Sequence, residues 1–229
     1  MTHQYPDRTE AGRVLARLIK RRPLAATPIV IGLPRGGVPV AFEVAEALRA
    51  PLDVLVVRKI GAPGHSELAC GAFILGGEVV WNKRVLKALQ LSAEDLEDIR
   101  REELKEAQRR EAELRGVNTQ PLAFVGASVV IVDDGLATGA TMKAAVLGVL
   151  AQQPREVVVC IPVAPEESCR EIENMGVSVI CDQRISSGEF SSVGEWYRKF
   201  PQVSTEECRV LLNRSRELFG EGSGASRSA

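Results

Sequence analysis

The stretch "VVIVDDGLATGAT" (129–141) decides the fold, because it joins a buried strand to a helix through a loop of small residues. Four β-branched apolar residues run into Asp133 and Asp134, and Gly135 permits a sharp turn directly after them. An apolar run without polar alternation is typical of a strand that is covered on both faces, as in a parallel sheet. The two acids therefore stand where the strand ends and the backbone turns.

The same pattern recurs along the chain and predicts an α/β fold. Apolar β-branched runs predict strands, and helical patterns separate most of them; strand–helix alternation favours a mostly parallel sheet flanked by helices. The length of 229 residues favours one domain over 1–219, followed by a disordered tail over 220–229. The predicted strands are 27–33, 52–57, 127–133, 155–163 and 176–182, and the predicted helices are 38–49, 139–152 and 165–175.

A charged segment, "SAEDLEDIRREELKEAQRREAELRG" (92–116), interrupts this alternation. Ser92 and Asp95 have the spacing of a capping box, which predicts an inserted helix that starts here. Its apolar stripe is thin, as in a solvated helix that packs along one face. A dimer contact through this stripe, and hence a homodimer, is the alternative.

Composition excludes several classes of partner. The net charge is −1, so we expect no broad attraction to nucleic acid or to an anionic membrane. No apolar run reaches the roughly 18 residues that span a bilayer, and the polar N-terminus does not resemble a signal peptide. The five cysteines are widely spaced, which favours buried thiols over disulfides or zinc. We expect a cytoplasmic protein.

The loop after the two acids has the composition of a phosphate site. Backbone N–H groups at the start of a helix bind anions when no bulky side chain stands in the way. Carboxylates accept hydrogen bonds from neighbouring hydroxyls, so acids and loop together suit a sugar phosphate at the carboxyl edge of the sheet. The alternative is that the acids only end a strand and cap a helix. The loop residues are Ala137, Thr138, Gly139, Ala140 and Thr141.

A second anion site is predicted nearer the N-terminus, at "PRGG" (34–37). Pro34 fixes the backbone after a strand, and Gly36 and Gly37 let it bend into a helix. Arg35 adds a permanent positive charge and a fork of donors. A tight turn with an exposed arginine is the alternative.

The segment "VVRKIGAPGHSELACGAF" (56–73) carries further candidates. Arg58 and Lys59 are expected to close a strand. The turn formers of "GAPGHSE" predict a mobile loop that closes over a substrate, with His65 and Glu67 inside it. The alternative for both side chains is exposure to solvent without a role.

Several of these motifs resemble one family. The stretch 129–141 is similar to the PRPP-binding signature of type I phosphoribosyltransferases. The order of "DR-EAG", "PRGG", "RK-GAPGH-E", "VDDG-ATGAT" and "VGEWY-FPQV" resembles a bacterial and archaeal subgroup of that family over residues 5 to 218. The resemblance implies a type I phosphoribosyltransferase-like fold. Gly135 departs from it, because the family usually has an apolar residue there.

The resemblance also implies roles for the motifs. Asp133 and Asp134 would contact the ribose hydroxyls, and the loop 137–141 would bind the 5-phosphate. Residues 34–37 would grip the pyrophosphate of PRPP, which Arg58 and Lys59 would approach. The implied reaction displaces pyrophosphate from C1 of PRPP by a nitrogen acceptor of the nucleobase class.

Arg35, Lys59, Asp133 and Asp134 are the predicted catalytic residues. Mg²⁺ would bind mainly through substrate oxygens and water, with Asp133 and Asp134 as candidate contacts. The expected partners are therefore PRPP and a small-molecule acceptor. The alternative is a regulatory protein on the same fold that senses PRPP or a nucleotide without turnover.

The segment "FSSVGEWYRKFPQVSTEE" (190–207) concentrates aromatic residues in a chain that has few. Trp196 and Tyr197 could stack on an acceptor base from a C-terminal hood segment. The competing interpretation is a small satellite core that holds a C-terminal helix, with Ser204 and Glu207 as its capping box.

Overall fold

A computed structural model describes residues 3–116, 122–186 and 188–219 of the chain. Its main sheet has five parallel strands in the order β2-β1-β6-β7-β8. The predicted parallel sheet is thus confirmed, and each of the five predicted runs overlaps one of its strands, although β7 and β8 extend past the predicted C-terminal ends. These strands are β1 (Pro28–Gly32), β2 (Leu52–Val54), β6 (Ser128–Val132), β7 (Glu156–Pro165) and β8 (Ser178–Ile185).

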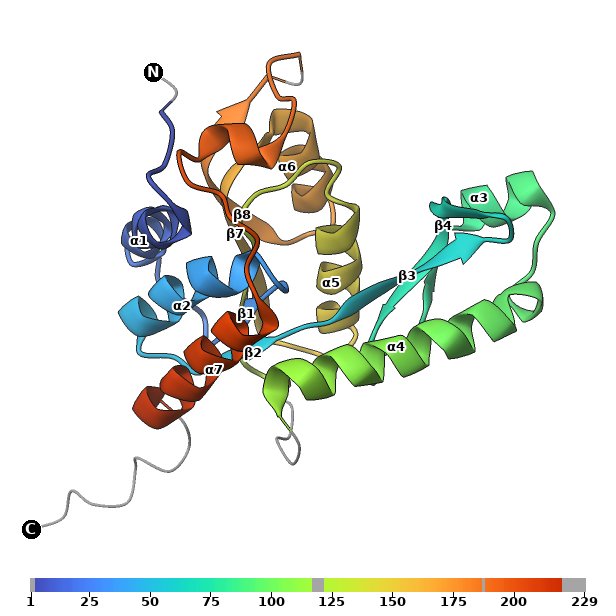
Figure 1. Ribbon diagram of the computed structural model, residues 1–229, viewed down its shortest axis with the longest axis horizontal. Helices are drawn as coiled ribbons and strands as arrows, with labels where there is room; N and C mark the ends of the chain where they lie inside the picture. The colour runs from blue at the N-terminus through green and yellow to red at the C-terminus, as the bar shows by residue number, and fades with distance from the viewer. Residues whose placement is uncertain (1–2, 117–121, 187, 220–229) are drawn as a thin grey trace, which may run out of the picture.

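Helices cover both faces of this sheet, which is why its central strands contain almost no polar residues (Figure 1). Val130 and Val132 of β6 pack into the core beneath α1, α2 and α7, whereas Val129 and Ile131 pack into the core beneath α5 and α6. Successive residues of a strand point to opposite faces, so an unbroken apolar run fills both cores. The covering helices are α1 (Arg8–Ile19), α2 (Gly37–Leu48), α5 (Ala140–Leu150), α6 (Glu166–Glu173) and α7 (Thr205–Phe219).

An antiparallel arm projects from this layered body (Figure 1). We call residues 57–89 the arm. Its three strands pair in the order β3-β4-β5, and the inserted helix α4 lies along it and returns to the body. The elements of this region are β3 (Val57–Ala62), β4 (His65–Ile74), β5 (Val80–Trp81), α3 (Lys83–Leu89), η1 (Glu94–Leu96) and α4 (Glu97–Arg115).

The arm corrects two predictions. The run 52–57 is not one strand, because β2 ends at Val54 and the chain then leaves the main sheet for β3. Arg58 and Lys59 therefore begin a strand of the arm instead of closing a strand of the sheet. "GAPGHSE" is not an open loop: Pro63 and Gly64, the latter with a φ of +75°, turn β3 directly into β4.

The inserted helix is confirmed as a solvated helix that packs along one face. The Ser92 and Asp95 side chains hydrogen-bond each other at 2.8 Å, and Asp95 also accepts from the Ser92 amide. Leu96, Ala107 and Leu114 are buried against the body and the arm, while most other side chains face water. The dimer alternative stays a prediction.

The N-terminal segment meets the segment that precedes α7 (Thr205–Phe219). Tyr5 pairs with Tyr197: the Tyr5 amide donates to the Trp196 carbonyl at 2.8 Å, and the Arg198 amide donates to the Tyr5 carbonyl at 2.8 Å. A 3₁₀ turn, η2 (Val193–Trp196), precedes this bridge, and α1 follows it on the N-terminal side. None of the helices described is both long and apolar enough to cross a membrane. The predicted tail, 220–229, lies outside the described residues.

Candidate active site

Two loops meet at the carboxyl edge of the sheet, one after β1 and one after β6. These strands are neighbours, and the Leu33 amide donates a 2.9 Å hydrogen bond to the Val132 carbonyl. Gly36 lets the loops approach each other, since a Cβ atom there would lie 2.0 Å from Oδ2 of Asp134. A Cβ atom at Gly37 would lie 2.7 Å from the Val132 carbonyl oxygen. The "PRGG" and "DDG" motifs therefore form one site.

Asp133 and Asp134 follow β6 directly and are half-buried. Oδ2 of Asp134 accepts a 2.8 Å hydrogen bond from Nε of Arg8, whose side chain is 10% exposed. Nη1 of Arg8 donates to the Pro201 carbonyl at 2.7 Å, and the guanidinium carbon lies 3.8 Å from the centre of the Phe200 ring. Arg8 therefore joins the first helix, the acid pair and the C-terminal segment.

The electrostatics of the acid pair are unfavourable without a ligand. Burial raises the pKa of Asp133 well above its ordinary value, and the adjacent Asp134 carboxylate raises it further. Burial also raises the pKa of Asp134, although the Arg8 guanidinium opposes this rise. Two carboxylates kept at a half-buried edge are typical of a functional site.

Gly135 is explained by its contact with the C-terminal segment. A Cβ atom at Gly135 would lie 2.6 Å from Cγ1 of Val193 in η2 and 3.2 Å from the Val163 carbonyl oxygen. The apolar side chain that the resemblance leads one to expect would therefore displace η2. Gly135 brings η2 down onto the turn after the acids.

The loop 137–141 has open donors. Ala137, Thr138, Ala140 and Thr141 are exposed, while Gly139 turns the chain into α5 with a φ of +69°. The N-terminus of α5 has no side-chain cap, so its first N–H groups are available to an anion. The hydroxyl of Ser168 in α6 donates to the Ala137 carbonyl at 2.8 Å and holds the loop in place.

A cavity of about 470 Å³ lies beside these loops. Pro34, Arg35 and Thr141 line one side of it, and α4 supplies Arg109, Arg110 and Glu113 to its wall. Arg35 is exposed here, as expected for a residue that contacts a ligand. The remaining lining comes from Leu33, from Leu55, Val56 and Val57 between β2 and β3, and from Leu114 and Thr205.

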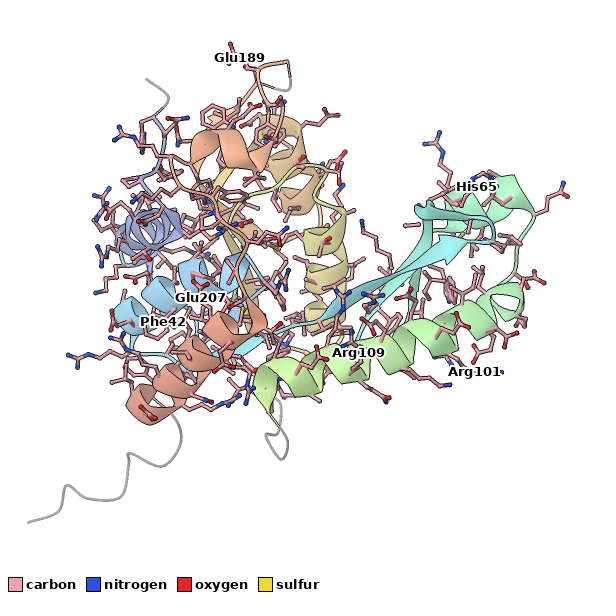
Figure 2. All side chains as sticks on the ribbon, viewed as in Figure 1. Phe42, His65, Arg101, Arg109, Glu189 and Glu207 are labelled. Atoms are coloured by element: carbon pink, nitrogen blue, oxygen red, sulfur yellow. The ribbon has the colours of Figure 1, made fainter. Side chains whose placement is uncertain are left out.

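The structure does not bring the basic residues of the arm to this cavity. Nε of Arg58 donates to Oε2 of Glu103 in α4 at 2.6 Å. Lys59 lines a separate hollow beside the hairpin turn, together with His65. His65 lies at the far tip of the arm, well away from the sheet (Figure 2). Glu67 belongs to β4, but its side chain lies outside the described part of the structure.

The C-terminal aromatics are divided between two roles. Tyr197 is 4% exposed, packs against Tyr5, and its hydroxyl donates to the Asp134 carbonyl at 2.6 Å. It is thus part of the satellite core and is closed to a stacking base. Trp196 is half-buried and stacks on Phe190 with ring centres 6.4 Å apart, so a base contact there stays a prediction. The predicted cap of α7 is present, since the Glu207 amide donates to Oγ of Ser204 at 3.0 Å.

Reasoning from the sequence missed four residues of this region. Tyr5 and Arg8 belong to "YPDRTEAG", which matched the motif order of the family but has no local feature that points to the acids. Arg109 and Arg110 belong to the charged helix, where arginines alternate with glutamates along the entire segment. Only the placement of α4 against the sheet distinguishes these two from the others.

Taken together, fold and site define a class: a parallel α/β protein with an acid pair and an uncapped helix N-terminus at one sheet edge. The model of the phosphoribosyl transferase domain matches residues 74–196, which is more than half of the chain. The chain belongs to this family.

Individual relatives agree with this assignment. Two proteins named "Putative phosphoribosyl transferase" from two strains of Mycobacterium tuberculosis are each 42% identical over 226 residues, covering 98% of this chain. This chain spans only about half (50%) of their length. The crystal structure of TT1426 from Thermus thermophilus has 37% identity and a TM-score of 0.79, with 92% of this chain and 98% of that chain covered.

Proposed function

We propose that this chain transfers a phosphoribosyl group from PRPP to a nitrogen acceptor of the nucleobase class. One observation carries the proposal: Asp133 and Asp134 lie at the same sheet edge as the uncapped N-terminus of α5. A ribose 5-phosphate between them would give its hydroxyls to the carboxylates and its phosphate to the N–H groups of the loop.

The chemistry follows from what the reaction needs. The acceptor nitrogen shares its lone pair with C1 of the ribose, the bond from C1 to the pyrophosphate oxygen breaks with its electron pair, and the acceptor gives up a proton to solvent. Negative charge grows on pyrophosphate, so fixed cations close to it lower the barrier. Arg35 lies at the cavity for this role. Orientation of the acceptor against C1 contributes further.

The residues present fit a magnesium ion that is held mainly by the substrate. In the described part of the chain, no three histidine, cysteine or acidic side chains gather as a metal site. Mg²⁺ keeps several waters and is commonly bound by one or two carboxylates plus substrate phosphates. Asp133 and Asp134 could provide those carboxylates. The bound ion would neutralise charge on the pyrophosphate.

The test is pyrophosphate release from PRPP and Mg²⁺, with purines, pyrimidines and nicotinate-type acceptors added one at a time. We expect release with one acceptor class and none from the double variant Asp133→Asn, Asp134→Asn, which keeps the shape of both side chains. PRPP binding without release for any acceptor would contradict turnover and support a sensor. Unchanged release from the double variant would remove the acids from the site.

A further inference from the structure

The cavity beside the two loops has a second basic wall that the motifs of the sequence do not indicate. Arg109, Arg110 and Glu113 of α4 line it together with Pro34, Arg35 and Thr141. Figure 2 shows Arg109 on the part of α4 that approaches the body, whereas Arg101 lies farther out along the arm. An anion that extends from the loop 137–141 into this cavity would meet three arginines.

Arg109 and Arg110 are oriented by ion pairs within α4 that are exposed to solvent. Nε and Nη2 of Arg109 each donate to Glu106 at 2.8 Å, and Nε of Arg110 donates to the same carboxylate at 2.7 Å. Nη1 of Arg109 also contacts Glu113. The two arginine side chains are 58% and 52% exposed. Exposed pairs within one helix contribute little, so a multiply charged anion could replace these glutamates at low cost.

The helix that carries these arginines is firmly anchored to the sheet. Arg115, one to two turns further on, is buried: its Nε donates to Oδ1 of Asp53 at 2.7 Å and its Nη2 to the Val54 carbonyl at 2.7 Å. The neighbouring Leu114 is also buried in the main core. The position of Arg109 and Arg110 relative to the cavity is therefore set by the fold, as a binding wall requires.

We infer that Arg109 and Arg110, together with Arg35, bind the pyrophosphate group of PRPP and of the released product. This inference rests on the proposed function and deepens it. It assigns to the inserted helix the role that the sequence had suggested for Arg58 and Lys59. Arg58 does not line the cavity, and its side chain is only 19% exposed where it pairs with Glu103, while Lys59 lines the hollow at the hairpin. Charge-assisted contacts of arginine with phosphate are strong and bidentate, which suits a leaving group.

The test is calorimetric titration with two probes, inorganic pyrophosphate in Mg²⁺ and ribose 5-phosphate. The double variant Arg109→Gln, Arg110→Gln should weaken pyrophosphate binding by roughly tenfold or more and change ribose 5-phosphate binding less than about twofold. Arg101→Gln is the matched control, since its side chain is 63% exposed on the same helix and pairs with Glu97 and Asp98. The variant with Arg109→Lys and Arg110→Gln should bind pyrophosphate more tightly than the double glutamine variant.

Each outcome decides the inference. If pyrophosphate affinity of the double variant equals that of the control, or if the wild-type chain does not bind pyrophosphate, the inference is overturned. If both ligands weaken together, the arginines shape the site without selecting the pyrophosphate, which also overturns it. If pyrophosphate binding depends on the arginines but no acceptor supports release from PRPP, the inference stands and the proposed turnover fails.

Discussion

Each acid after β6 is constrained in its own way. Asp134 has two partners that lie far from it in the sequence: Arg8 donates to its carboxylate, and the Tyr197 hydroxyl donates to its carbonyl. The Asp133 amide donates to the Cys160 carbonyl at 3.4 Å, while its carboxylate accepts a 2.9 Å hydrogen bond from the neighbouring amide of Asp134 and, among the described residues, has no ion pair with Arg8. Asp133 is thus the less compensated charge of the two, which is what a group kept for a ligand would show.

Replacing Asp133 by asparagine should stabilise the fold while abolishing PRPP binding. Because burial raises the pKa of Asp133, the folded state holds a proton that the unfolded state releases, and stability falls as the pH rises through the interval from the ordinary aspartate pKa to the raised one. Asparagine keeps the contact with the Asp134 amide and carries no charge. We expect Asp133→Asn to gain roughly 1 kcal/mol near pH 8 and less near pH 4.

Urea denaturation of both proteins at pH 4, 6 and 8 measures this gain. A stability difference that is constant with pH would show that Asp133 does not titrate in this interval. A loss of stability at pH 8 would show that its charge is compensated in the folded protein.

Arg8 should behave as a positioning residue for Asp134. Arg8→Gln removes the charge that compensates the buried Asp134 carboxylate, so we expect a loss of about 3 kcal/mol in the free energy of unfolding. Arg13→Gln on the same helix is the control, since Arg13 is 57% exposed, and its unfolding midpoint should stay close to that of the wild-type protein.

A double-mutant cycle of Arg8→Gln with Asp134→Asn separates the pair from other contacts of Arg8. Denaturation of the four proteins should give a coupling of about 1 kcal/mol or more. Additive losses would mean that Arg8 acts through Pro201 and Phe200 alone.

The elements of the main sheet could be predicted from the sequence, because each strand's own residues indicate that it is buried. A strand buried on both faces needs an unbroken apolar run, and the segments 127–133 and 155–163 each contain such a run. The inserted helix could also be predicted, from the spacing of Ser92 and Asp95. Local chemistry was sufficient wherever an element meets a uniform environment.

The arm could not be predicted from the sequence, because nothing in "LDVLVVRKIGA" (52–62) marks the point where the chain leaves one sheet for another. Val54 and Val57 are both apolar, and the separation of β2 from β3 depends on which neighbours they find. The ion pair between Arg8 and Asp134 joins positions 126 residues apart. Such contacts follow from tertiary placement, which spacing along the chain does not encode.

The anchor of α4 should control both stability and ligand binding. Arg115→Gln leaves Asp53 buried in the middle of β2 without this charged partner, so we expect a loss of about 3 kcal/mol in the free energy of unfolding. Because the same anchor positions the α4 wall, pyrophosphate affinity should fall as well. Arg100→Gln is the control, since this side chain is 39% exposed and pairs with Glu97 one turn away.

Denaturation and pyrophosphate titration of both variants distinguish the outcomes. Lower stability with wild-type pyrophosphate affinity would show that α4 keeps its place without Arg115. That result would show that the position of Arg109 and Arg110 at the cavity does not depend on the ion pair between Arg115 and Asp53.

At the scale of the whole molecule, two segments far apart in the sequence meet beside the candidate site: the N-terminal segment and the segment that precedes α7. Tyr5 pairs with Tyr197 in a short parallel bridge, and this bridge places Tyr197 and Arg8 against Asp134. Within the described residues, the two segments of this bridge contribute no acid, no phosphate donor and no cavity wall of their own. Their role is to hold the turn after β6 in the form that a ligand would need.

Ligand binding at the acids should therefore slow the opening of the bridge. If opening disorders Asp134, a ligand that binds only the closed form stabilises it by about 2.7 kcal/mol at one hundred times its dissociation constant, which slows exchange roughly a hundredfold. We expect PRPP with Mg²⁺ to protect the backbone amides of Tyr5 and Arg198 against hydrogen exchange to this extent. Amides paired between β3 and β4 in the arm serve as the control and should change little. Equal protection of arm and bridge would indicate a general stabilisation, and no protection at the bridge would show that the bridge opens without disturbing the acids.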